Sequence, residues 1–176
     1  RWTLAPEAMA SLISEHRGSL SLRERIALPQ HISALLQADA IEAKVYLDAN
    51  KELATEEHRL IVGSVNGNVS FIHRRVVSDA DRPAFQKYVR RLLAPHLRRI
   101  GFAPKPGEPA EVALLRPSLI SALIRKGDDK KLRGKMLGYA RKFMKDPESV
   151  PPDMARLGMS LLVETGGKPL WEQLKA

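Results

Sequence analysis

The chain of 176 residues contains no cysteine. This absence excludes a scaffold stapled by disulfides and any metal site built on thiolates, and it favours a cytoplasmic location. Aromatic residues are scarce, at 5% of the sequence, so aliphatic side chains must fill the interior. No apolar run approaches the roughly 20 residues that a membrane-spanning helix needs, so we expect no part of the chain in a membrane.

Sequence patterns typical of hydrolytic or phosphate-binding sites are also missing. A His-Glu-x-x-His zinc helix needs a histidine followed by glutamate, and none of the five histidines has one: His16, His31, His58, His73 and His96. Neither a Gly-x-Ser-x-Gly elbow nor a phosphate-binding loop occurs. We therefore predict no catalytic residue, cofactor-binding residue or metal ligand in this chain. His96 stands beside Leu92 and Leu93 on a predicted helix, which indicates a packing role.

The net positive charge comes entirely from the second half of the chain. Residues 1–88 contain 11 basic and 11 acidic residues, whereas residues 89–176 contain 18 basic and 9 acidic ones, which accounts for the whole net charge of +9. A basic half can face nucleic acid, an anionic surface or an acidic neighbouring domain. No nucleic-acid-binding motif accompanies the charge, so we favour solvated helix faces and expect no nucleic acid partner.

The segment from Asp81 to Glu108 gives the clearest local signal. Its apolar residues recur at steps of three and four, which places them on one face of a helix. Asp81 is predicted to cap this helix and Gly101 to end it in a left-handed conformation. Pro104, Pro106 and Gly107 then form a stiff connector, after which helical spacing resumes.

The rest of the chain repeats this arrangement of helix, short connection and helix. A capping box at Ser21 and Glu24 opens one of these helices. Short connections make successive helices pack antiparallel. We therefore predict an all-α fold, an irregular α-solenoid of antiparallel helix pairs resembling HEAT or armadillo repeats (an alpha-alpha superhelix) and forming one monomeric domain over residues 1–176.

Residues 58–77 admit two interpretations. Asn66-Gly67 between two β-branched runs is a hairpin signal. The aliphatic residues of the same segment fall on one helical stripe: Ile61, Val65, Val69, Ile72 and Val76. A lone hairpin in a helical chain has no sheet to join, so we predict a helix.

Several stretches resemble the C-terminal helical domain of zinc aminopeptidases related to aminopeptidase N. The resemblance rests on FQKYVRRLLAPHLRRIGFAPKPGE, followed by LLRPSLISAL and Gly127-Asp128. Leu22-Arg23-Glu24-Arg25-Ile26 is similar to an earlier helix of that domain. Arg1-Trp2 is similar to the end of the strand that leads into it, so residues 1–4 are a possible strand remnant. The chain is thus expected to be a fragment of a longer polypeptide.

The resemblance implies that the parent enzyme removes N-terminal residues from peptides. In that family, zinc is held in a separate thermolysin-like domain by a His-Glu-x-x-His helix, beside a Gly-x-Met-Glu-Asn loop. Neither motif occurs in this chain, so no catalytic or metal residue carries over and the zinc is expected in the parent's catalytic domain. The implied role of this chain is to cover the catalytic cleft while being inactive alone, with the parent's catalytic domain and peptide substrates as its partners.

Arg116 is the candidate residue with the sharpest geometric argument. On a helical wheel it lies about 40° from the direction shared by Val112, Leu119 and Leu123, and thus on the inward side. An inward guanidinium must be paired, must reach the surface or must face a concavity. The favoured interpretation is an ion pair with a carboxylate of a neighbouring helix.

The functional alternative is that Arg116 binds the C-terminal carboxylate of a peptide. Arg125 and Lys105 would then be further substrate-facing residues that attract the same group.

A function of another class stays open beside the aminopeptidase interpretation. A free-standing helical-repeat scaffold that binds a protein or nucleic acid would have the same fold. An upstream zinc motif in the complete gene would distinguish the two.

Overall fold

A computed structural model of the chain describes residues 5–175. Within that range the backbone forms eight α-helices and two short 3₁₀ turns, at Arg17–Ser19 and Pro147–Ser149, and no strand. The helices are α1 (Pro6–Ser14), α2 (Leu22–Gln37), α3 (Ala43–Leu53), α4 (Arg59–Arg75), α5 (Arg82–Ile100), α6 (Ala110–Arg125), α7 (Lys130–Lys145) and α8 (Pro152–Lys175). Helix α8 is kinked at Gly167, whose backbone is not helical (φ 58°, ψ −157°). The predicted all-α class is confirmed. The possible strand remnant at residues 1–4 lies outside the described residues.

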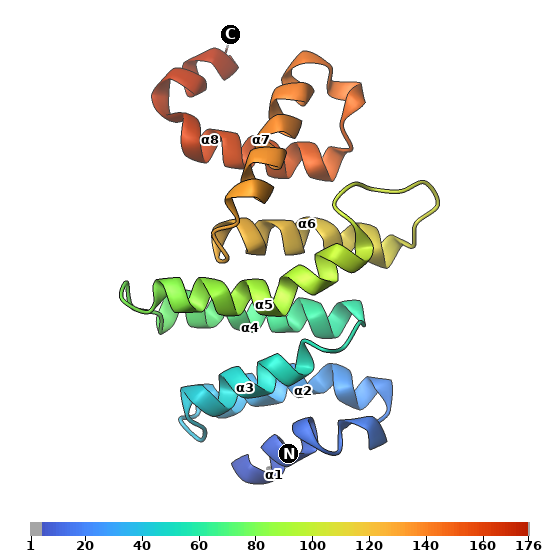
Figure 1. Cartoon of the computed structure of the whole chain (residues 1–176), viewed down its shortest axis with the longest axis vertical. Helices are drawn as coiled ribbons and strands as arrows, with labels where there is room; N and C mark the ends of the chain where they lie inside the picture. The colour runs from blue at the N-terminus through green and yellow to red at the C-terminus, as the bar shows by residue number, and fades with distance from the viewer. Residues whose placement is uncertain (1–4, 176) are drawn as a thin grey trace.

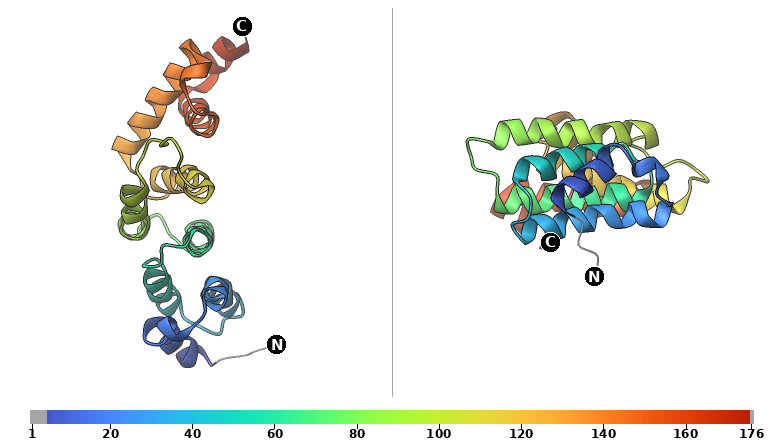
Figure 2. Two further views of the ribbon diagram at one scale, coloured as in Figure 1. Left: turned by 90° about the vertical axis from the view of Figure 1, so that its right-hand side faces the viewer. Right: turned by 90° about the horizontal axis from the view of Figure 1, so that it is seen from below.

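The helices stack along one axis in two layers, with the two ends of the chain at opposite ends of the stack (Figure 1). Figure 2 shows α2, α4, α6 and α8 in one layer and α1, α3 and α5 in the other, while α7 runs obliquely along the stack from the side of α5 and packs across α8. One continuous apolar core runs between the layers, and it includes Leu53, Leu93 and Leu119, each fully buried. This arrangement is the predicted α-solenoid of helix pairs.

The helix ends test the predicted caps. The capping box of α2 is present, since the Ser21 hydroxyl accepts the Glu24 N–H and the Glu24 carboxylate accepts the Ser21 N–H at 2.8 Å. Gly101 ends α5 with φ of +85°, as predicted. The prediction for Asp81 was wrong, because this residue makes no side-chain cap. Its backbone is already helical (φ −83°, ψ −13°), whereas a capping residue needs an extended conformation to fold its side chain back.

The ambiguous segment 58–77 is helical, as predicted, and forms α4. Ile61, Val65 and Val69 are at most 2% exposed. Gly63 and Gly67 lie on the exposed side, where a Cβ atom would meet nothing within 4 Å. Val76, the last residue of the predicted stripe, follows the end of α4 and is 53% exposed. Burying the other four aliphatic side chains outweighs the local turn preference of Asn66-Gly67, because each buried aliphatic side chain contributes about 1.5–3 kcal/mol.

Helix α8 crosses α7 at a glycine. A Cβ atom at Gly158 would lie 2.9 Å from the carbonyl oxygen of Met136 and 3.1 Å from the backbone nitrogen of Ala140. Both neighbours are backbone atoms of α7 and cannot move aside cheaply. Gly158 therefore sets how closely the last two helices approach.

This contact predicts opposite effects for two glycine substitutions. Gly158→Ala should lower the free energy of unfolding by about 1–3 kcal/mol through overpacking. The matched control Gly138→Ala, on the open side of α7, should raise it by up to about 1 kcal/mol through helix propensity. Denaturant unfolding of both variants measures the difference. Stabilisation by both substitutions would contradict the close contact.

Candidate functional site

Arg116 of α6 is buried, with 1% of its surface exposed. Its Nη1 donates to Glu108 Oε1 at 2.6 Å and its Nη2 donates to Glu108 Oε2, while Nε donates to the Gly101 carbonyl at 3.0 Å. The predicted internal ion pair is therefore confirmed. The carboxylate comes from the connector, residues 101–109, and not from a neighbouring helix.

The ion pair fixes the connector to α6. The hydrogen bonds from Arg116 hold the pKa of Glu108 below its usual value, so the carboxylate is ionised at neutral pH. Because the guanidinium is bonded to Glu108 and Gly101, direct contact between Arg116 and a peptide would require this pair to open. That contact stays a prediction.

The other two predicted residues lie apart from each other. Lys105 is exposed in the connector, with its stem over Gly101, near the end of α6 that bears Arg116. Arg125 is the last residue of α6, about 13 Å of helix further on. It is exposed and donates to the hydroxyl groups of Ser121 and Ser160, at 2.6 and 2.9 Å, and to the Glu164 carboxylate. The structure thus brings Lys105 close to the Arg116 pair, but not Arg125.

A groove of about 360 Å³ separates α6 from α8. Leu114, with 61% of its surface exposed, contributes an apolar wall. The polar side chains come from both helices, and the Ser121 and Ser160 hydroxyl groups that accept from Arg125 are among them. The groove opens on the layer formed by α2, α4, α6 and α8. Neither α6 nor α8 alone gives a sequence signal for it, because it exists only where the two helices meet.

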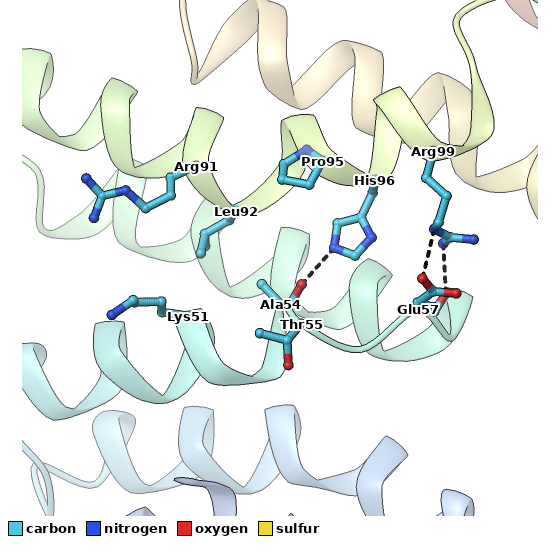
Figure 3. Close-up of a pocket in the computed structure, with 9 residues that line it drawn as sticks. All are labelled: Lys51, Ala54, Thr55, Glu57, Arg91, Leu92, Pro95, His96 and Arg99. Atoms are coloured by element: carbon cyan, nitrogen blue, oxygen red, sulfur yellow. Dashed lines mark hydrogen bonds and ion pairs between the residues drawn. The ribbon is translucent and has the colours of Figure 1, made fainter.

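A second pocket, of about 330 Å³, lies between α3 and α5 on the other layer (Figure 3). Its apolar lining comes from Ala54, Leu92 and Pro95, and cationic side chains from both helices also line it. At one end Arg99 pairs with Glu57, with 3.6 Å between Arg99 Nε and Glu57 Oε1. No local sequence pattern predicts this pocket, because its two walls are about 40 residues apart in the chain.

His96 links the two helices that form this pocket. It is 5% exposed, and its Nε2–H donates to the carbonyl of Ala54, the residue that ends α3, at 2.8 Å. The predicted packing role is confirmed, and the carbonyl acceptor fixes the tautomer with the proton on Nε2. Burial lowers the pKa of His96, and the Arg99 guanidinium adds to this lowering.

Two classes of site are absent from the described part of the chain. Residues 5–175 contain no cluster of three histidine, cysteine or acidic side chains that could hold a metal ion. None of the described helices is long and apolar enough to cross a membrane.

Comparison with known proteins gives one match. The family model described as "ERAP1-like C-terminal domain" matches residues 1–176. Neither the curated proteins nor the solved structures contain a match to this chain.

The buried pair predicts a strongly coupled response to mutation. Arg116→Met should lower the melting temperature by roughly 5–10 °C, because it leaves a partly buried carboxylate without its partner. The double variant Arg116→Met, Glu108→Leu should recover part of that loss, as calorimetry or circular dichroism can measure. The exposed Arg125 is the matched control, since Arg125→Met should cost no more than about 2 °C. Additive effects of the two single variants at 108 and 116 would contradict the coupling.

His96 predicts a loss of stability in mild acid. Its pKa is lower in the folded chain than the value of about 6.5 in the unfolded chain. The unfolded state therefore takes up the proton first, and stability falls as the pH drops below about 6.5. In His96→Gln the side-chain amide can still donate to Ala54 but does not titrate. Between pH 7.5 and pH 5.5, denaturant unfolding should show a smaller loss of stability in this variant than in the unsubstituted chain. An equal loss of stability in both would exclude His96 as its cause.

Proposed function

The chain belongs to the family of ERAP1-like C-terminal domains, and we propose that it covers the catalytic cleft of a zinc aminopeptidase. Membership in the family implies that the chain is part of a metalloaminopeptidase. The match over residues 1–176 is the observation that carries the proposal. Zinc and the catalytic groups are proposed to lie in another domain of the parent, with this chain inactive alone and monomeric.

The groove between α6 and α8 supports a role in holding peptide substrates. It joins an exposed leucine, Leu114, to hydroxyl groups and a nearby arginine, Arg125. Such a mixture of apolar wall and few polar groups is typical of ligand sites. We assign the groove to the peptide segment that extends beyond the catalytic centre.

Arg125 is better suited than Arg116 to exchange its partner for a substrate. The Arg125–Glu164 pair is partly exposed, with 32% and 46% of the two side chains accessible. Exposed pairs contribute at most about 1 kcal/mol, so a peptide carboxylate can replace Glu164 at little cost. The Arg116–Glu108 pair is buried, and opening it is expensive. Arg116 thus supports the site by holding the connector that carries Lys105.

If zinc and the catalytic groups lie in another domain, this chain and the complete polypeptide should differ in zinc content and activity. The 176-residue chain should retain no stoichiometric zinc after dialysis and should not cleave aminoacyl reporter substrates. The complete polypeptide containing it should retain zinc and cleave them. Elemental analysis and a chromogenic assay measure both properties. A complete polypeptide without zinc and activity would instead favour the free-standing scaffold that binds a protein or nucleic acid.

The substrate role of Arg125 predicts a change in peptide preference. In the complete enzyme, Arg125→Gln should raise KM about tenfold for peptides with a free C-terminus. It should have little effect on the same peptides with an amidated C-terminus. Arg141→Gln, an exposed position on α7, is the matched control and should alter neither KM. An equal rise for both peptides in Arg125→Gln would refute recognition of the carboxylate.

A further inference from the structure

The pocket between α3 and α5 has a charge imbalance that the proposed function does not use. Its lining includes three cations, Lys51, Arg91 and Arg99, and one carboxylate, Glu57. Glu57 pairs with Arg99 at one end. Among the side chains of residues 5–167 that the structure describes, no carboxylate oxygen lies within 4 Å of the charged nitrogens of Lys51 or Arg91.

The two unpaired cations come from different helices. Arg91 extends from α5 and Lys51 from α3, and their side chains lie across from each other at the end of the pocket opposite Arg99 (Figure 3). A doubly charged anion between them would neutralise both at once, and each contact would be a charge-assisted hydrogen bond. The guanidinium also supplies a planar pair of donors that fits a phosphate group.

The surrounding charges increase the attraction for anions. Helix α5 carries six basic residues and no acidic one, and α7 carries seven basic residues and no acidic one. Two cations of α5 are paired with carboxylates, Arg82 with Asp79 and Arg99 with Glu57, and α3 also carries Asp48 and Glu52. The remaining excess of cations raises the local concentration of anions at the surface.

The pocket also suits an apolar body. Ala54, the buried Leu92 and the exposed Pro95 line it, and the ring of His96 is held in place by its hydrogen bond to Ala54. The volume of about 330 Å³ lies at the lower end of the range typical of small-molecule sites, which are mostly apolar with a few placed polar groups.

We propose that the pocket between α3 and α5 binds a phosphate monoester with a small apolar body, through Lys51 and Arg91 on the phosphate and through Leu92, Pro95 and Ala54 on the body. The site lies on the layer opposite the groove between α6 and α8. It is therefore independent of the peptide role proposed for that groove.

Titration of the 176-residue chain with phenyl phosphate tests the proposal, with ¹H–¹⁵N NMR spectra to locate the site. Phenyl phosphate should bind with a Kd on the order of 1 mM, as a ligand of this size allows. The shifted resonances should include those of Lys51, Ala54 and Leu92. Inorganic phosphate and benzyl alcohol, which lack the body and the charge respectively, should each bind about tenfold more weakly.

Two variants separate this site from general attraction to a basic surface. The double variant Lys51→Gln, Arg91→Gln should raise the Kd for phenyl phosphate at least about tenfold. Arg98→Gln removes an exposed charge from α5 outside the pocket and should leave the Kd within about twofold. Both positions in the double variant are exposed, so its circular dichroism melting curve should match that of the unsubstituted chain.

Three results would overturn the proposal. The first is a Kd for phenyl phosphate that is the same in the double variant and in the unsubstituted chain. The second is a loss of affinity for phenyl phosphate in Arg98→Gln that equals the loss in the double variant. The third is a set of shifted resonances that excludes the walls of this pocket. In each of these cases the cations on α3 and α5 act only as solvated charges.

Discussion

Each helix of this chain buries one stripe of side chains, and that constraint makes every helix depend on its neighbours. In α4 the buried residues include Ile61, Val65 and Val69, whereas Gly63 and Gly67 face outward. A single helix of this length is marginal in water, because its stability comes mainly from the packing of one face. The two layers supply that packing by enclosing one core along the whole stack. The solenoid is therefore held together by contacts of each helix with its neighbours in the stack, both the next helix in the chain and the one after it, as with α2 and α4.

Apolar stripes alone do not fix how one helix slides against the next, and buried polar groups supply this register. The amide of Asn68 in α4 donates to the Pro29 carbonyl of α2 at 3.1 Å and to Asn50 Oδ1 of α3 at 2.8 Å. The Ser33 hydroxyl donates to Asn68 Oδ1 at 2.8 Å. Displacing any of the three helices would leave a buried amide without partners, at a cost of about 1–3 kcal/mol for each group. The pair of Arg116 and Glu108 has the same role for the connector in the second half.

The sequence predicted the features that depend on neighbours within a turn or two. The capping box at Ser21, the end of α5 at Gly101 and the helical state of 58–77 all follow from local spacing. The inward position of Arg116 also follows from a helical wheel, but its partner does not, because the path of the connector decides which carboxylate reaches it. The cap assigned to Asp81 was wrong for a related reason. The preceding turn gives Asp81 a helical backbone, and residue type alone does not reveal this. Lys51 and Arg91 resemble any solvated charges until the fold places α3 beside α5.

The fold shows which surfaces carry the cations of the basic half of the sequence. Most of its cations lie on α5 and α7, two helices without an acidic residue, although Arg99 of α5 is paired with Glu57. In the layer opposite α5, α6 carries Glu111 beside its two arginines, and Arg125 is paired with Glu164 of α8. Screening at physiological salt limits the reach of surface charges to about 8 Å, so the α5 and α7 cations act mainly on ligands close to these helices. The excess charge is therefore poorly placed to steer a peptide into the groove between α6 and α8. If the groove holds a peptide as proposed, recognition there depends on contacts at short range, such as those of Arg125 and Leu114. The cations on α5 and α7 would then attract other anions.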